Sequence, residues 1–470
     1  MEKPEQPIRP QGNVFLARLK HVIGLDRAIA FTVLARGWST IAGVVTILLI
    51  AHFLTLAEQG YYYTFASLVA LQIVFELGFS FVILQLAAHE RAHLNIRQDG
   101  SITGDSIAHS RLASVFQKSV RWYSVGAVLM AALLLPAGMH FFALHRQPGA
   151  QVAWQMPWIA AVLATIFTFQ MDPIFAFLEG CGRIPEVARM RFAQAVTGSL
   201  MAWTTLCLHH GLFAPAMVIS GQALAGGYFL FTQRKLLLPL FRRNTAGNIV
   251  SWRHEIWPFQ WRIAISWLCG YFIFQLFNPV LFAYRGATEA GQMGMSLTIA
   301  SALSAIALAW MNTKASPFGT LVARREFVAL DRIFFRTLWQ SALLLAIGAV
   351  VVILGIAVVA QRAPHLAVRI LPLPVFAVLL ATTLCNHVVF SEAIYLRAHK
   401  REPFLPLSIA VGGLTACSTL LLAKFWGAPG VTLGYFCTSG AFGLAFGTHI
   451  FVTKRRQWRN VSFLEDSSSL

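Results

Sequence analysis

Apolar runs of about twenty residues or more recur along the whole chain, and short polar breaks separate each run from the next. A helix that crosses a bilayer needs ~20 mostly apolar residues. Of the 470 residues, 57% are hydrophobic and only 12% are charged, and the mean hydropathy is +0.63. A single water-soluble core stops growing near ~250–300 residues, so it could not hide this much apolar surface. The sequence therefore predicts an all-α protein that crosses a membrane many times.

The apolar runs predict about twelve transmembrane helices. We place them at 30–53, 61–87, 120–144, 154–178, 188–209, 212–232, 257–282, 290–313, 335–360, 370–396, 404–424 and 429–452. The polar N-terminal stretch contains no short apolar core with a small-residue cleavage site, so we expect the first spanning helix itself to direct insertion. An even number of spans puts both termini on the same side of the membrane.

The distribution of basic residues predicts which side that is. Of the 37 Lys and Arg residues, 30 lie in the N-terminal segment, the even-numbered connections and the C-terminal tail. The opposite loops hold only Arg146, Arg285, Arg362, Arg369 and Lys424. Basic residues favour cytoplasmic loops, so we expect an inner (plasma) membrane protein with both termini in the cytoplasm. The net charge of +18 then reflects topology, and no nucleic-acid partner is expected.

The chain also appears doubled. The motif Ala57-Glu-Gln-Gly60 precedes the second predicted helix, and Thr288-Glu-Ala-Gly291 precedes the eighth. In each case the preceding helix carries an early arginine. We therefore predict two pseudo-symmetric six-helix bundles with the substrate site between them, the alternative being that a short turn signal occurs twice by chance. The predicted parts are a cytoplasmic segment (1–29), a first bundle (30–232), a basic linker (233–256), a second bundle (257–453) and a cytoplasmic tail (454–470).

Charged residues inside apolar helices are costly, and they are functional candidates for that reason. The five candidates are Arg36, Glu76, Asp172, Arg262 and Lys314. All five are predicted to lie in the cytoplasmic half of the bilayer, so we expect them to face one wet cavity open to the cytoplasm. The alternatives are snorkelling arginines, a structural partner for Glu76, a cap by Asp172 on a kinked helix, and a headgroup anchor at Lys314.

The remaining polar residues of the helices favour structural roles. Glu179 and Glu392 lie near helix ends, where we predict interfacial salt bridges. His387 is expected to form a hydrogen bond across helices, with proton relay as the alternative. The six cysteines are interpreted as small buried hydrophobes. The sequence contains no metal-ligand spacing, phosphate loop or nucleophile–histidine pair, so it predicts neither an enzyme nor a metal site.

Several stretches resemble a known family of transporters. They are Phe75-Glu-Leu-Gly-Phe79, Leu178-Glu-Gly-Cys-Gly-Arg-Ile184, the region from Glu289 to Pro317, and Tyr395-Leu-Arg-Ala-His-Lys400. In this order they are similar to segments of the multidrug/oligosaccharidyl-lipid/polysaccharide (MOP) exporter superfamily, in its polysaccharide transporter or O-antigen flippase branch. The resemblance implies a MATE-like V of two bundles that alternates its access between the two sides. The lipid II flippase branch is similar too, but it usually has two further helices that this sequence lacks.

The resemblance also implies a substrate, an undecaprenyl-pyrophosphate-linked oligosaccharide or polysaccharide precursor for lipopolysaccharide or exopolysaccharide. Arg36, Arg262 and Lys314 would then bind the pyrophosphate, because arginine forms bidentate, charge-assisted bonds to phosphate. Glu76 and Asp172 would bind a coupling proton or Na+. No other cofactor is expected, and the expected partners are membrane lipids and polysaccharide polymerase machinery. The alternatives are a cation-coupled multidrug exporter of the same superfamily, a membrane scaffold, or a lipid-modifying enzyme.

Overall fold

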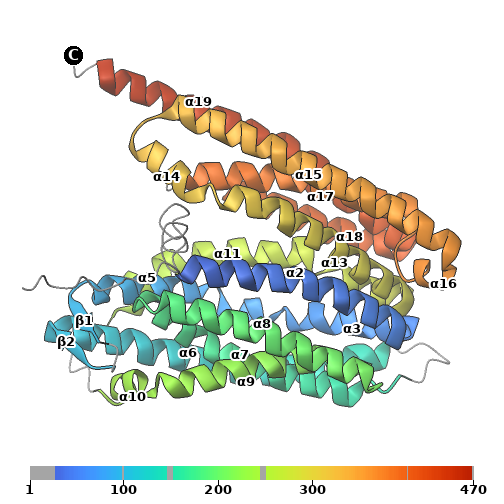
Figure 1. Ribbon diagram of the computed structural model, residues 1–470, viewed down its shortest axis with the longest axis horizontal. Helices are drawn as coiled ribbons and strands as arrows, with labels where there is room; N and C mark the ends of the chain where they lie inside the picture. Colours follow the sequence, from blue (N-terminus) through green and yellow to red (C-terminus); the bar gives the residue numbers. More distant parts are fainter. Residues whose placement is uncertain (1–26, 98–99, 146–151, 244–249, 400, 468–470) are drawn as a thin grey trace, which may run out of the picture.

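The computed structural model describes residues 27–97, 100–145, 152–243, 250–399 and 401–467. Long helices that run side by side make up most of it (Figure 1). A short hairpin interrupts them, in which β1 (Leu94–Ile96) pairs antiparallel with β2 (Ile102–Gly104). Most of the predicted N-terminal segment lies outside the described residues, as do the last three residues of the predicted tail. The chain is an all-α polytopic membrane protein.

The first half contains six long helical segments, of which the second is divided into three pieces. Its helices are α2 (Arg27–Phe53), α3 (Leu56–Val69), α4 (Gln72–Glu76), α5 (Phe79–Arg91), α6 (Ser106–Leu144), α7 (Gln155–Gly180), α8 (Ile184–Cys207), the single turn η2 (Gly211–Phe213) and α9 (Ala214–Thr232). Side-chain caps begin two of them. Thr55 and Glu58 form a reciprocal capping box on α3, and Asp105 caps α6.

The second half follows a short helix in the predicted linker. That helix is α10 (Arg234–Arg242), and the linker ends with η3 (Trp252–Ile256). The elements of the second half are α11 (Trp257–Phe274), α12 (Phe277–Arg285), α13 (Ala287–Asn312), α14 (Ala315–Ala323), α15 (Phe327–Arg362), α16 (Pro364–Ala367), α17 (Leu373–Ala398), α18 (Leu405–Tyr435), η4 (Phe436–Phe442) and α19 (Gly443–Ser467).

By length and hydropathy, 8 helical segments of the described chain can cross a membrane, or up to 10 if each of two bent pairs is one span. The segment Leu405–Arg459 counts once in that number, although Gly427 has a left-handed φ of 62° and divides it into two helices. The helix α8, whose first turns carry arginines, is not among the segments. Each of the twelve predicted runs nevertheless coincides with a helix or a bent pair of helices in the described residues.

Several predicted helix boundaries were wrong. The third helix, predicted to begin at 120, begins at Ser106, and the seventh, predicted as one helix over 257–282, is bent by 41° between α11 and α12. The second span was predicted as one helix over 61–87, but Leu77 and Gly78 have left-handed φ values of 52° and 67° and break it. A Cβ at Gly78 would collide with Ile263 of α11, so only glycine permits this close approach. The last helix was predicted to end at 452, but α19 continues to Ser467. A reading based on apolar residues stops where a helix leaves the membrane, even when its backbone continues.

The spans form two bundles that meet along one seam. In the first bundle α8 packs on α2 and α9, while α7 packs on α5, α6 and α9. In the second bundle α17 packs on α13, α15 and α19, and α11 packs on α18. Figure 1 shows α15 and α19 diverging from the first bundle toward the C-terminus, whereas α13 lies close to α3 near the other end. This is the predicted V of two bundles, while the residue boundaries of the two halves remain a prediction.

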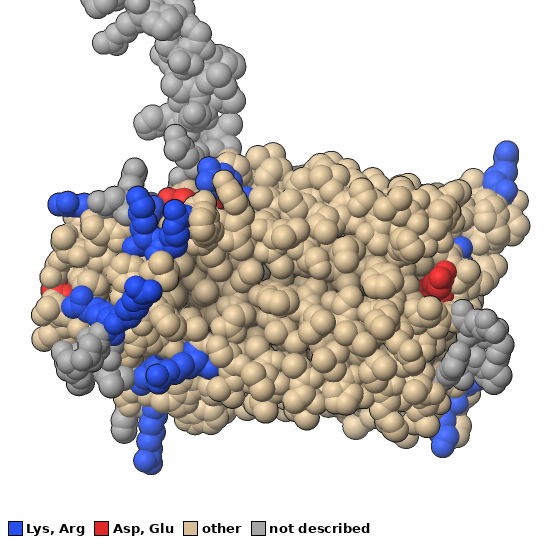
Figure 2. Space-filling view, turned by 90° about the horizontal axis from the view of Figure 1, so that it is seen from below, with Lys and Arg blue, Asp and Glu red and all other residues tan. Residues whose placement is uncertain are grey.

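The two ends of the molecule differ in charge. On the face drawn in Figure 2, Lys and Arg gather at one end, and a wide belt without charged residues separates them from the other. We call the end where α5 and α17 terminate and α6 begins the basic end, and the end that carries Arg285, Arg369 and Lys424 the opposite end. The basic end is the one predicted to face the cytoplasm.

Candidate functional site

The two halves are sealed together at the opposite end by the paired motifs identified in the sequence. Gly60 of α3 lies against Ala287 and Gly291 of α13. A Cβ at Gly60 would collide with the Ala287 carbonyl oxygen, and a Cβ at Gly291 would lie 2.9 Å from the Gly60 nitrogen. The backbones of α3 and α13 therefore touch, as small residues allow between membrane helices. The repeated motif marks the place where the two halves meet.

Hydrogen bonds reinforce this seal. Gln59, which is only 1% exposed, donates from Nε2 to the carbonyl oxygens of Gly291 and Arg369, at 2.9 Å each. Arg369 donates from Nη1 to Gln59 Oε1 at 3.1 Å and from Nη2 to the Leu54 carbonyl oxygen at 2.6 Å. The sequence identified Arg369 only as a loop charge, because its partners lie more than 300 positions away. We call Leu54, Gln59, Gly60, Gly291 and Arg369 the outer seal.

The two predicted acids lie together inside the first bundle. Ser80 Oγ donates to Glu76 Oε1 and lies 2.7 Å from the Tyr123 hydroxyl oxygen. The charge of Glu76 acts on Asp172, and the charge of Arg191 acts on both acids. These residues come from α4, α5, α6, α7 and α8, so the cluster joins five helices. Ser80 lies four positions after Glu76, and this spacing is the only local signal that would have identified Ser80.

Of the predicted cations with described side chains, neither Arg36 nor Lys314 has a described contact with these acids. The Arg36 side chain is exposed on α2, and the structure describes no hydrogen bond or ion pair from it. Lys314 is half-buried between α13 and α14. Arg262 belongs to α11, but its side chain lies outside the described part of the structure. The structure thus brings Glu76 and Asp172 together, and the binding of phosphate by the three cations remains a prediction.

At the basic end, an ion-pair network joins the start of the second half to the first. Arg111 of α6 donates to Glu90 at 2.8 Å and also to Glu255 of η3. Lys118 donates to the carbonyl oxygen of Val250. Burial by itself would raise the pKa of the Glu255 carboxyl. The Ser251 backbone N–H and the Arg111 guanidinium outweigh that effect and hold this pKa below its ordinary value.

The interior of the second bundle also contains polar groups. His387 is fully buried and lies 2.8 Å from Ser341 Oγ, so the predicted bond across helices is confirmed. The predicted salt bridge of Glu392 was wrong, because this residue is 3% exposed and its Oε2 has no hydrogen-bond partner. The predicted salt bridge of Glu179 is confirmed, because its Oε1 lies 3.2 Å from Arg191 Nη2. In the part of the chain that the structure describes, no group of three His, Cys, Asp or Glu side chains could hold a metal ion.

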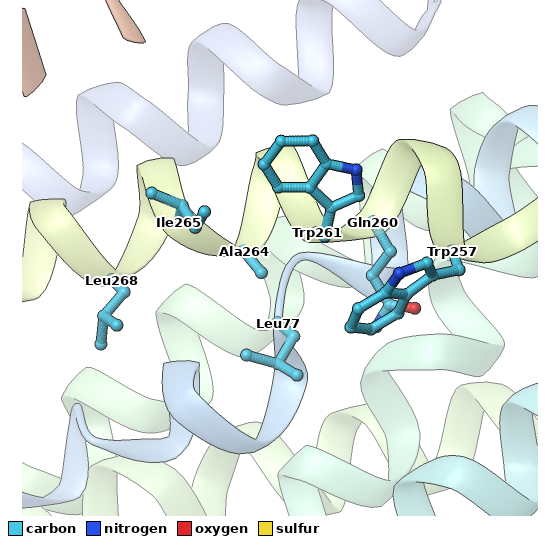
Figure 3. A pocket seen from close by; sticks show the side chains of 7 residues that line it. All are labelled: Leu77, Trp257, Gln260, Trp261, Ala264, Ile265 and Leu268. Atoms are coloured by element: carbon cyan, nitrogen blue, oxygen red, sulfur yellow. The ribbon is translucent and has the colours of Figure 1, made fainter. Parts of the chain in front are cut away.

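A pocket of about 450 Å³ lies where the break in the second span faces α11. Its lining residues are Leu77, Trp257, Gln260, Trp261, Ala264, Ile265 and Leu268. Figure 3 shows Leu77 on the broken helix opposite the others, which all come from α11. The lining is almost entirely apolar apart from the Gln260 carboxamide. The sequence could not identify this pocket, because the backbone break that forms one wall was not predicted.

Comparison with solved structures finds this fold in known transporters. The lipid II flippase MurJ, in an inward closed conformation, aligns with a TM-score of 0.60 over 93% of each chain, at 12% sequence identity. A MATE transporter in complex with MaL6 aligns with a TM-score of 0.53 over 92% of this chain and 98% of its own, at 14% identity. The eukaryotic MATE transporter AtDTX14 also aligns with a TM-score of 0.53, over 94% of this chain and 99% of its own, at 12% identity.

Other matching structures are described as transporters of the MOP superfamily, one of them from Pyrococcus furiosus. No protein-family model matches the chain, and no curated protein does. At these identities the likeness shows the fold: the chain has the two-bundle architecture shared by MATE transporters and MurJ.

Proposed function

We propose that the chain is a flippase of a bacterial inner membrane. Its substrate is an undecaprenyl-pyrophosphate-linked oligosaccharide, which it moves from the cytoplasmic to the periplasmic leaflet. One observation carries the proposal. The two bundles are sealed at the opposite end by the outer seal and diverge at the basic end, in a fold that a lipid II flippase shares. A lipid-linked glycan made on the cytoplasmic side needs access from that side.

The transport cycle follows from this geometry. With the outer seal closed, the substrate enters between the bundles from the basic end. Arg36, Arg262 and Lys314 bind the pyrophosphate, since a diphosphate that crosses lipid needs charge-assisted partners. The outer seal then opens while the basic end closes. Glu76 and Asp172, which lie together inside the first bundle, bind the proton or cation that returns the carrier to its starting state.

The test is complementation of a deletion strain, with surface polysaccharide as the measurement. Replacement of Arg36 and Arg262 together by alanine should abolish export. Arg262→Lys should reduce export although the charge is kept, because lysine lacks the bidentate fork of arginine. Arg189→Ala, which changes an exposed arginine at the basic end, is the matched control and should export normally. Membrane abundance is measured for each variant. Wild-type export by the double alanine variant at normal abundance would contradict the phosphate-binding role.

A second candidate function is cation-coupled export of amphipathic drugs. The observation that favours it is the pair of half-buried acids in the first bundle, because acids within a membrane helix bundle can bind a coupling cation or a cationic substrate. The two candidates differ in phenotype. A drug exporter should change the minimal inhibitory concentrations of cationic dyes on deletion and leave surface polysaccharide intact. The flippase should do the reverse.

A further inference from the structure

The pocket at the broken second span contains a polar group without a partner. Gln260 is 0% exposed, and neither its Nε2 nor its Oε1 has a hydrogen-bond partner. Buried side-chain amides in folded proteins are nearly always hydrogen-bonded, because an unsatisfied donor or acceptor is costly. Figure 3 shows the Gln260 side chain among the pocket residues, beside Trp257. A group that completes this site would offer both an acceptor and a donor.

The rest of the lining has a polarity gradient. Trp257, Gln260 and Trp261 lie in the first turns of α11, next to the basic end, while Ala264, Ile265 and Leu268 lie deeper along the helix. From Trp257 to Leu268 the lining extends about 16 Å at the helical rise of 1.5 Å per residue. Tryptophan favours the headgroup level of a membrane, and aliphatic residues favour its interior. A matching ligand is polar at one end and hydrocarbon at the other.

The pocket is also accessible and large enough for a ligand. Trp257, Trp261 and Leu268 are 51%, 38% and 36% exposed. Its volume of about 450 Å³ falls within the ~300–1,000 Å³ range of small-molecule sites. The opposite wall is Leu77, at the left-handed break that Gly78 permits. The break gives this seam between the halves a concave wall in place of a continuous helix.

We propose that this pocket binds the junction of a polyprenyl pyrophosphate, where the isoprenoid chain meets its phosphate-linked headgroup. The first isoprene units lie along Ala264, Ile265 and Leu268. Gln260 Nε2 donates to a phosphate oxygen, and Gln260 Oε1 accepts from a hydroxyl of the first sugar. A bare hydrocarbon would satisfy neither atom. The inference rests on the proposed function, and it gives the lipid carrier its own site at the seam between the second span and α11.

The experiment is photolabelling of the purified full chain with a benzophenone-bearing geranylgeranyl pyrophosphate, followed by peptide mapping. Labelling should fall within 257–268 and around Leu77, and it should be competed by geranylgeranyl pyrophosphate but not by inorganic pyrophosphate. Ala264→Trp fills the pocket and should reduce labelling roughly tenfold, because the indole overlaps the space of the isoprene units and a loss of ~1.4 kcal/mol corresponds to a factor of ten. The matched control is Ala132→Trp, at an exposed position of α6, which should label as the wild type does.

A second variant guards against misfolding of Ala264→Trp. Gln260→Leu keeps the side-chain size and removes the polar partner. In this variant the label should still map to the pocket. Geranylgeranyl pyrophosphate should no longer compete with the label better than geranylgeraniol does. Labelling confined to other surfaces, or wild-type labelling of Ala264→Trp, would overturn the inference.

Complementation separates this inference from the proposed function. If the deletion strain lacks surface polysaccharide and Ala264→Trp restores it with unchanged labelling, the flippase stands and the pocket assignment is wrong. If the deletion strain makes normal polysaccharide but the label maps to the pocket and is lost in Ala264→Trp, the prenyl site stands and the flippase assignment is wrong.

Discussion

Glu255 lies at the point where the chain passes from the basic linker into the second half. Its carboxylate accepts from the Ser251 backbone N–H at 2.7 Å and from Arg111 of the first bundle. The helix α6 that carries Arg111 is about 58 Å long at 1.5 Å per residue, nearly twice the ~30 Å hydrocarbon core. Its first turns therefore project beyond the membrane, where this ion pair meets water and responds to pH.

We expect the contribution of Glu255 to stability to disappear in acid. Its pKa is lower in the folded chain than in the unfolded chain, so the contribution is present above the ordinary pKa of glutamate and is lost as the pH falls through the folded value. Glu255→Gln should lower the free energy of unfolding by about 1 kcal/mol at neutral pH, as is usual for half-exposed pairs. Thermal unfolding in detergent measures it. A difference between variant and wild type that stays constant down to acid pH would contradict the prediction.

Among the elements, the pair α3 and α13 determines how closely the two halves approach at the opposite end. Three glycines make unusual contacts near the seam. Gly60 and Gly291 let the two backbones touch, and Gly78 lets the broken second span approach α11. These contacts leave no space for even one added methyl group, so the two backbones either touch or separate. The outer seal is therefore either formed or open, as alternating access requires.

Gly60→Ala should open the outer seal. The added methyl group would collide with the Ala287 carbonyl oxygen, and overpacking of this kind costs ~1–3 kcal/mol. The reporter is Ser67→Cys on α3, 1% exposed in the wild type, in a background without the native cysteines. Its reaction with an impermeant maleimide should accelerate roughly tenfold, since ~1.4 kcal/mol corresponds to a factor of ten.

The control for this change is Gly43→Ala in α2, where an added Cβ meets no atom within 4 Å. Maleimide labelling of this variant should equal that of the Ser67→Cys reporter protein without the Gly43 change. Equal labelling of the Gly60 and Gly43 variants, at equal membrane abundance, would mean that the glycine contact does not control the outer seal.

For the molecule as a whole, charge and shape together define a direction. The basic end carries most of the Lys and Arg residues, and it is also the end at which the bundles diverge. The end that the positive-inside rule assigns to the cytoplasm is thus also the open end of the V. If that end faces the cytoplasm, the structure is the state in which the proposed flippase receives its substrate.

Reporter fusions test this orientation. Alkaline phosphatase, which is active only in the periplasm, should be inactive when fused after Ser467 and active when fused after Phe425. A green fluorescent protein fusion should show the reverse pattern. A phosphatase-active C-terminal fusion would contradict the orientation, and with it the direction of the proposed transport.

Much of the architecture could be predicted from the sequence. Hydropathy located a helix for each apolar run, and the repeated motif around Gly60 and Gly291 marked the contact between the halves. The candidate site could be predicted only in part. Glu76 and Asp172 were identified because charges in apolar helices are rare. Arg369 was identified only as a loop charge and Glu255 was not identified, because their partners come from distant parts of the chain.

The sequence by itself determined the membrane environment, the number of apolar runs and the asymmetry of charge. These properties are sums over neighbouring residues, so they need no knowledge of the fold. Only the tertiary structure decided that Leu77 and Gly78 would break the second span and that Gln260 would be buried without a partner. Both depend on the packing of the second span against α11, two segments that lie about 180 positions apart in the chain. No local pattern records that contact, because hydropathy describes a helix and its solvent but not the neighbouring helix against which it packs.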